Sequence, residues 1–82
     1  LDPDDVPLLA GEVVHTDQNG QLGHANEIIA TLPATLPNSH VISSSGVPAN
    51  ADRLHFTADG QREMGRRYAV QMLKLLGNRF AR

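Results

Sequence analysis

Cysteine is absent from this sequence of 82 residues, which excludes disulfide bonds and thiolate chemistry within the chain. Aromatic residues are scarce, because the chain has two phenylalanines, one tyrosine and no tryptophan. The sequence therefore shows no aromatic platform for a sugar ring. A large excess of one charge is also lacking: the formal net charge is −2 at pH 7, which argues against a nucleic-acid partner.

Long apolar runs are missing as well. The longest, Val6 to Ala10 and Leu75-Leu76, are far too short to cross a membrane, so no membrane association is expected. The first residues show no basic segment followed by an apolar one, so no signal peptide is visible. The first residue is Leu rather than Met, and we expect the chain to begin within a longer protein.

What the chain does contain is an alternation of strand-like and helix-like segments. Val6 to Val14 is almost continuously apolar and predicts a strand of a parallel sheet. Apolar residues at helical spacing between His24 and Leu36 predict a helix that stops near Thr31 or Leu32, because Pro33 follows. His40 to Ser45 predicts a second strand, which completes a right-handed β-α-β unit.

A second helix is predicted to begin at Ala58, with Thr57 as its N-cap and Gly77 just beyond its end. Gly65 inside this helix costs about 1 kcal/mol relative to alanine, so we expect a close contact with the sheet there. Gly11 is likewise expected at a turn or a close backbone approach.

The resulting fold class is α/β with the order β-α-β-α. A sheet of two parallel strands leaves both edges unpaired unless more chain completes it. We therefore expect residues 1–82 to form the C-terminal part of one larger, three-layer, doubly wound domain.

The chemistry-bearing pair is Asp52 and His55, a carboxylate three residues before an imidazole in a loop that leads into a helix. A serine hydrolase needs a nucleophile, a histidine that takes its proton, and a carboxylate that orients the histidine. Open α/β folds build such sites at the carboxyl edge of the sheet. The pair is predicted to be the acid and base of a triad; the alternative is a structural hydrogen bond at the start of the helix.

The combination of Asp52-x-x-His55-Phe56 with the run Gly65 to Ala69 resembles the closing block of SGNH hydrolases, whose domain is flavodoxin-like. The closest resemblance is to carbohydrate acetylesterases, which include acetylxylan esterases of carbohydrate esterase family six and sialate O-acetylesterases. It implies that His55 is the general base and Asp52 its orienting acid. It also implies a secreted parent enzyme that removes O-acetyl groups from plant cell-wall polysaccharide such as xylan, through an acyl-serine and without metal or cofactor.

The nucleophile and oxyanion-hole blocks of that family are missing from this sequence. Its serines, Ser39 and Ser43 to Ser45, do not lie in a Gly-x-Ser turn between a strand and a helix. We expect the chain alone to be inactive, and its partners to be an acetylated polysaccharide or oligosaccharide and the rest of the domain with its serine. Ser44 or Ser45 as a replacement nucleophile is a lesser alternative, because serines at strand ends usually bind backbone groups. A non-catalytic α/β module that self-associates through its sheet edges is the alternative class.

Three further groups of polar residues carry weaker functional signals. Glu12 ends a strand at the same edge as the pair, and is either a substrate-binding residue or only solvated. The four histidines and nearby aspartates lack the spacing of metal ligands, so no metal is expected. Arg62, Arg66 and Arg67 are predicted to form a solvated helix face, with one of them paired to a carboxylate.

Overall fold

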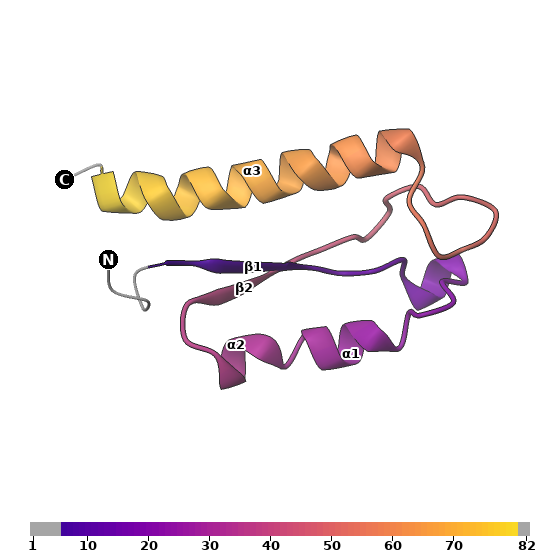
Figure 1. The fold of residues 1–82 in the computed structure, drawn as a ribbon, viewed down its shortest axis with the longest axis horizontal. Coiled ribbons are helices and arrows are strands. Elements are labelled where there is room, and N and C mark those ends of the chain that lie inside the picture. Colours follow the sequence, from indigo (N-terminus) through magenta and orange to yellow (C-terminus); the bar gives the residue numbers. More distant parts are fainter. Residues whose placement is uncertain (1–5, 81–82) are drawn as a thin grey trace.

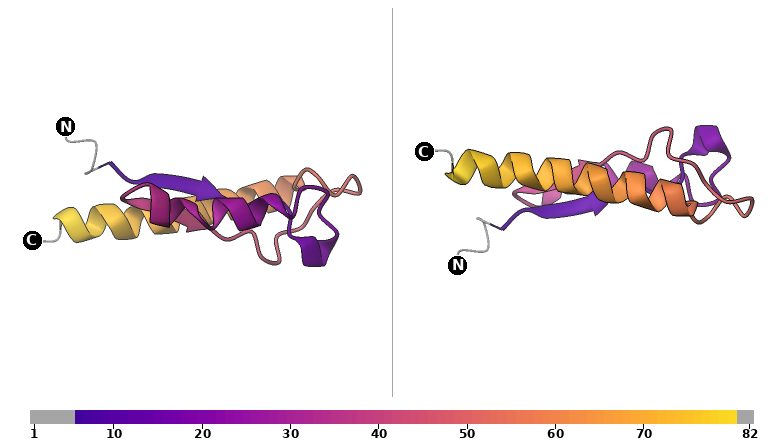
Figure 2. Two further views of the ribbon diagram at one scale, coloured as in Figure 1. Left: turned by 90° about the horizontal axis from the view of Figure 1, so that it is seen from below. Right: turned by 90° about the horizontal axis from the view of Figure 1, so that it is seen from above.

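The computed structural model describes residues 6–80, with the backbone alone for 78–80. The elements follow in the order β1 (Leu8–Gly11), η2 (Thr16–Gln18), α1 (Ala25–Ile29), α2 (Leu32–Thr35), β2 (Ser39–Ile42) and α3 (Ala58–Phe80). The strands form a middle layer, with α3 along one face and α1 and α2 along the other (Figures 1 and 2). The predicted α/β class and the order of its elements are confirmed.

The two strands are parallel, in a register that pairs Leu8 with Ser39 and Gly11 with Ile42. The first strand is shorter than predicted, because the main chain of Val13 bonds to a side chain instead of a strand. Val13 N–H donates to Asn26 Oδ1 at 2.9 Å, and Asn26 Nδ2 donates to the Val13 carbonyl at 3.0 Å. The strand pairing therefore ends where the Asn26 side chain of α1 satisfies the main-chain hydrogen bonds of Val13.

The predicted first helix stops before Pro33 as expected, although earlier than Thr31 or Leu32, and a short helix that was not predicted follows it. Helix α1 ends at Ile29, and Pro33 lies in the first turn of the separate short helix α2. Proline is tolerated there, because the N–H groups of the first turn have no partner within the helix. A proline therefore opens the second piece as well as ending the first.

Helix α3 begins at Ala58, and the Thr57 hydroxyl accepts the Gly60 N–H at 3.0 Å, which confirms the predicted N-cap. Two predictions for glycines in this helix are wrong. Gly65 is exposed, and a Cβ built there would have no neighbour within 4 Å, so it makes no close sheet contact. Gly77 keeps the right-handed conformation, and α3 continues to Phe80.

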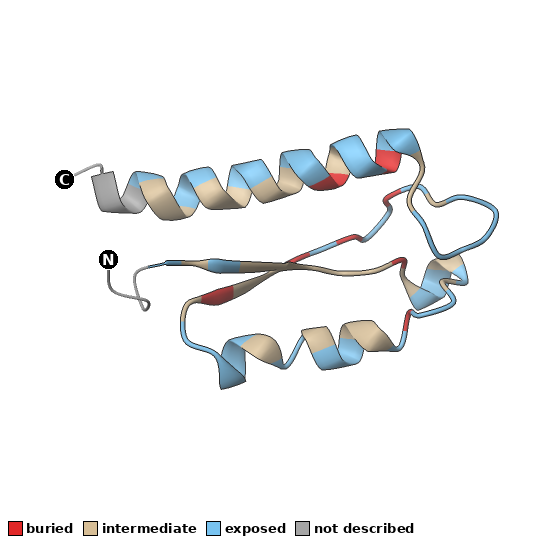
Figure 3. Ribbon diagram, in the orientation of Figure 1, coloured by how far each residue is buried: buried red, intermediate tan, exposed pale blue. Residues whose placement is uncertain are grey.

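The predicted close approach does occur at Gly11, which packs against the Tyr68 ring of α3 with no room for a Cβ. This contact borders a small core of Ile42, Val47 and Met64 between α3 and the sheet. Figure 3 shows the few buried positions, which lie on β2, on the first turns of α3 and in the segments that connect the elements. Other apolar side chains remain open, such as Ile28 at 68% and Leu73 at 69% exposure.

Both outer edges of the two-stranded sheet lack a neighbouring strand within residues 6–80. Over the same residues, no helix is long and apolar enough to cross a membrane.

Candidate active site

The predicted acid–base pair lies in a narrow loop between β2 and α3. Ala49 and Phe56 form an antiparallel bridge at the neck of this loop, and Asn50 N–H donates to the His55 carbonyl at 2.8 Å. Within the loop, Arg53 N–H donates to the Asn50 carbonyl at 2.9 Å. The loop lies beyond the carboxyl ends of both strands, beside the η2 segment (Figure 1).

Asp52 uses both carboxylate oxygens inside this loop. Oδ1 accepts the N–H groups of Leu54 and His55 at 2.9 and 3.1 Å, and Oδ2 lies 2.7 Å from His55 Nδ1. The hydrogen bond with the His55 ring, followed by those from the Leu54 and His55 N–H groups, lowers the pKa of Asp52 to about 2. Asp52 is therefore a carboxylate at neutral pH and can only accept hydrogen bonds.

The ionisation of Asp52 determines which nitrogen of the His55 ring carries the proton. Because the carboxylate cannot donate, His55 Nδ1 must carry the proton between them, and in the neutral ring Nε2 keeps its lone pair. The His55 side chain is 68% exposed, and within residues 6–80 its ring bonds to Asp52 alone. This arrangement orients a histidine so that Nε2 can take a proton from a group outside the loop.

Glu12 does not point into open solvent. Its Oε1 accepts the Ser44 N–H at 2.8 Å and lies 2.7 Å from His15 Nε2. Burial raises the pKa of Glu12, but the hydrogen bonds from His15 and Ser44 outweigh it and leave the pKa below its ordinary value. The Glu12 carboxylate joins the end of β1 to the chain that leaves β2, which gives it a structural setting.

The segment between β1 and α1 supplies contacts that the sequence did not reveal. Gln18 Nε2 donates to the Val47 carbonyl at 2.9 Å, and Gln21 Nε2 donates to the Asp52 carbonyl at 2.6 Å. The Gln21 N–H also donates to the Arg53 carbonyl at 2.9 Å. Since these partners lie about thirty residues further along the chain, no local pattern could have identified the glutamines.

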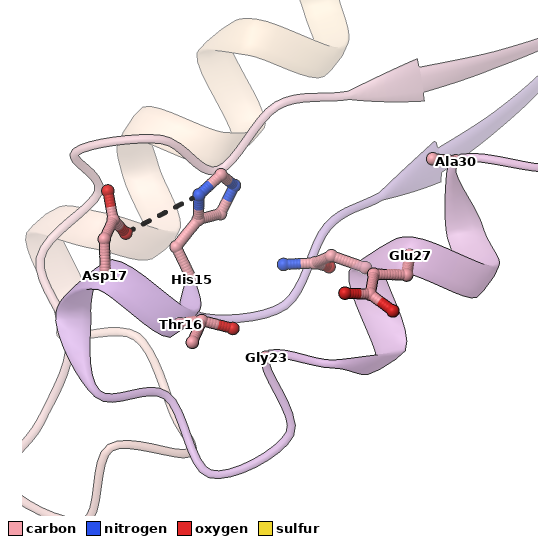
Figure 4. Close-up of a pocket in the computed structure, with 7 residues that line it drawn as sticks. His15, Thr16, Asp17, Gly23, Glu27 and Ala30 are labelled. Atoms are coloured by element: carbon pink, nitrogen blue, oxygen red, sulfur yellow. Dashed lines mark ion pairs between the residues drawn. The ribbon is translucent and has the colours of Figure 1, made fainter.

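A hollow of about 410 Å³ opens between η2 and α1. Figure 4 shows His15 turned toward Asp17 on one side of it and Glu27 on α1 at the other. The distance from His15 Nδ1 to Asp17 Oδ1 is 3.7 Å. Asp52 and His55 do not line this hollow, so it is separate from the acid–base pair.

The hydroxyl groups of Ser39, Ser43 and Ser44 form hydrogen bonds with main-chain groups and are not placed as nucleophiles. Ser44 is fully buried and donates its hydroxyl to the Val13 carbonyl at 2.6 Å, and Ser39 donates to Leu36 at 2.8 Å. Ser43 Oγ accepts the Ser45 N–H at 3.1 Å. Across residues 6–80, His55 has no hydrogen bond to a serine, so the nucleophile is not found beside it in this part of the chain.

Arg62, Arg66 and Arg67 bind carboxylates of the same helix, α3. Arg66 makes a bidentate pair with Glu63 at 2.8 and 2.9 Å, and Arg62 pairs with Asp59 at 2.6 Å. Arg67 also binds Glu63 and donates to the Ser43 carbonyl at 2.8 Å, which ties α3 to the end of β2. In the described part of the chain, histidine and acidic side chains form no cluster of three or more that could hold a metal ion.

Comparison with protein families adds a decisive observation. Residues 1–74 match the sequence model of the family described as carbohydrate esterase, sialic acid-specific acetylesterase. The chain belongs to this family. No solved structure gives a significant match. Membership of a carbohydrate esterase family confirms that part of the predicted resemblance, and it favours an esterase origin over a non-catalytic module.

Proposed function

We propose that this esterase chain supplies the acid–base half of a Ser-His-Asp triad that removes O-acetyl groups from carbohydrate. One observation carries the proposal. His55 Nδ1 lies 2.7 Å from Oδ2 of an aspartate whose pKa is lowered to about 2, which leaves Nε2 of an exposed ring available as a base. The family match supports ester hydrolysis as the reaction.

In the proposed reaction, His55 Nε2 takes the hydroxyl proton of the nucleophilic serine as its oxygen attacks the acetyl carbonyl carbon. The imidazolium, stabilised by Asp52, then gives this proton to the departing sugar oxygen, which leaves an acetyl-serine. Water attacks the acetyl-serine while His55 takes its proton. Acetate departs and the serine oxygen regains that proton from Nε2, so the base is restored.

The serine and the oxyanion-hole donors are proposed to come from a part of the same domain outside this sequence. The unpaired edges of the described sheet and the exposed Ile28 and Leu73 side chains support a larger domain. Because an oxyanion hole alone contributes several kcal/mol, the 82-residue chain is expected to show no esterase activity by itself.

The proposed substrate is an acetylated polysaccharide such as xylan, on the strength of the sequence resemblance. The description of the matching family names sialic acid instead. Acetate release from acetylated xylan and from O-acetylated sialic acid should therefore be compared with one enzyme preparation. A higher kcat/KM on the sialic acid ester would refute xylan as the preferred substrate and leave the proposed triad untouched.

The experiment that tests the proposed function uses the complete esterase domain that contains this chain. His55→Ala and Asp52→Asn should each abolish most acetate release, whereas Arg62→Ala on the solvated face of α3 should leave it unchanged. Full activity in the His55 variant would refute the proposal. A fluorophosphonate probe should label the complete domain but not the 82-residue chain, and labelling of Ser44 or Ser45 in the chain alone would overturn the predicted inactivity.

A further inference from the structure

The loop that carries Asp52 and His55 is not held in place by burial. Every residue from Asn50 to His55 is exposed, and Figure 3 shows this loop in pale blue. Apolar packing therefore contributes little to its position, and polar contacts must set where His55 stands relative to the sheet.

Hydrogen bonds within the loop determine its shape but not its placement. The bonds of Asp52 to Leu54 and His55, and that of Asn50 to His55, all join residues at most five positions apart. Such bonds would persist if the loop swung as a unit about its neck. The internal geometry of the pair and the position of the pair are thus two separate properties.

Gln21 supplies the link between this loop and another part of the molecule. Its side-chain Nε2 donates to the Asp52 carbonyl at 2.6 Å and its main-chain N–H donates to the Arg53 carbonyl at 2.9 Å. Among the described residues, both hydrogen bonds that connect residues 50–55 with the rest of the chain come from Gln21. Arg53 has a φ of 58°, so the loop turns sharply at the carbonyl that the Gln21 N–H binds.

Gln21 is itself anchored to the end of the first strand. The preceding Gly20 donates its N–H to the His15 carbonyl at 2.9 Å, and it packs against the Val14 main chain with no room for a Cβ. His15 in turn is bonded to Glu12 at the end of β1. A continuous set of contacts therefore runs from the sheet through Gln21 to Asp52.

We propose that Gln21 is a positioning residue, whose two hydrogen bonds to consecutive carbonyls fix the acid–base loop over the carboxyl edge of the sheet. This inference rests on the proposed function, because positioning matters only if His55 must meet a serine held elsewhere. A displacement of about 1 Å can lower a rate roughly a hundredfold when reacting groups must be aligned. Loss of the side-chain bond should therefore reduce kcat and leave substrate binding largely intact.

The test compares variants of the complete esterase domain in acetate release and in thermal unfolding. Gln21→Ala is expected to lower kcat by roughly 10- to 100-fold with little change in KM. Gln21→Glu keeps the size of the side chain but places an acceptor against the Asp52 carbonyl, so it should lower kcat at least as much. Gln18→Ala is the matched control, because Gln18 donates the same kind of bond to the carbonyl of Val47, outside the acid–base loop.

Each outcome supports or overturns the inference. A fall in kcat for both Gln21 variants, with a normal KM and a melting temperature no lower than that of Gln18→Ala, supports it. Wild-type kcat in Gln21→Glu overturns it, as does an equal fall in kcat for Gln18→Ala, which would indicate general loosening. His55→Ala in the same assay separates the two proposals: if that variant stays active, the proposed function fails, whereas an inactive His55 variant beside fully active Gln21 variants refutes only the positioning role.

Discussion

Two carboxylate-x-x-His pairs lie at the same end of this molecule, and they differ in the ring nitrogen that each binds. The distance between carboxylate oxygen and ring nitrogen is 2.7 Å in both. In the first pair Glu12 binds His15 through Nε2, and in the second Asp52 binds His55 through Nδ1. The two pairs therefore have the same spacing in the sequence, but their carboxylates bind different nitrogens of the imidazole ring.

The difference separates a structural pair from a pair suited to proton transfer. Both nitrogens of His15 face carboxylates, since Asp17 lies 3.7 Å from Nδ1, and the ring is only 26% exposed. The His55 ring is 68% exposed and bonds through Nδ1 alone within the described residues. A histidine can act as a general base only if one nitrogen is free and reachable, and His55 meets that condition.

The largest expected effect that distinguishes the pairs is on catalysis. In the complete esterase domain, His55→Ala should lower kcat by roughly 10²- to 10⁴-fold, the usual contribution of a positioned general base. His15→Ala should change kcat only a few-fold, because Glu12 still accepts the Ser44 N–H without the ring. Steady-state acetate release measures both. Equal losses in the two variants would remove the functional distinction between the two pairs.

The free energy of unfolding should rank the two pairs in the opposite order, with the larger loss for the Glu12 variant. Glu12→Ala leaves the Ser44 N–H without its acceptor at a fully buried residue, which should cost about 1–3 kcal/mol of unfolding free energy. Asp52→Ala, in an exposed loop, should cost clearly less. Glu12→Gln retains an acceptor oxygen and is the control. Urea unfolding of the complete esterase domain provides the measurement, and a larger loss for Asp52→Ala would contradict the structural role of Glu12.

The sequence predicts well those features that depend on neighbours along the chain. The N-cap at Thr57, the break at Pro33 and the proximity of Asp52 and His55 all arise within a few residues. The strand ends were not predictable, because Asn26 captures the main chain of Val13 from 13 residues away. Helical periodicity likewise could not show that Gly65 lies on the solvated face of α3, although the adjacent Met64 is buried.

The same reasoning explains what was missed in the candidate site. Glu12-x-x-His15 carries the spacing that identified Asp52 and His55, so this pair was visible in principle. Gln21 was not visible, because its partner Asp52 lies 31 positions away and a glutamine in a loop carries no pattern. Local spacing thus predicts that a carboxylate and a histidine meet, whereas the tertiary fold decides which nitrogen remains free.

The rates of chemical modification of His55 and His15 should also differ, but by a smaller factor than the effects on kcat. Diethyl pyrocarbonate acylates neutral, accessible imidazole nitrogens, so His55 should react several-fold faster than His15 in the folded chain. Peptide mapping by mass spectrometry resolves the two sites, and urea-unfolded chain is the control in which the rates should converge. Faster modification of His15 would show that its nitrogens are not occupied by Glu12 and Asp17 in solution.

The smallest effect concerns acid pH. Hydrogen bonding to His55, Leu54 and the His55 N–H lowers the pKa of Asp52 from 3.8 to about 2 in the folded chain, so ionised Asp52 stabilises the fold above about pH 4. This contribution is lost as the pH falls from about 4 to about 2. Unfolding free energies of wild type and Asp52→Asn should therefore differ by a constant amount at neutral pH and converge through that window.

Glu63→Gln provides the matched control for this pH dependence. Hydrogen bonds from Arg66 and Arg67 lower the pKa of Glu63 from 4.5 to about 2. The wild-type advantage over Glu63→Gln should therefore also be lost as the pH falls, over nearly the same range, although Glu63 binds arginines and not a histidine. The unfolding free energies of wild type and Glu12→Gln should likewise converge as the pH falls, because the pKa of Glu12 is also lowered. A wild-type advantage over Asp52→Asn that grows as the pH falls below 4 would mean that Asp52 does not hold His55 as an ionised acceptor, and the two pairs would then differ in protonation as well as in geometry.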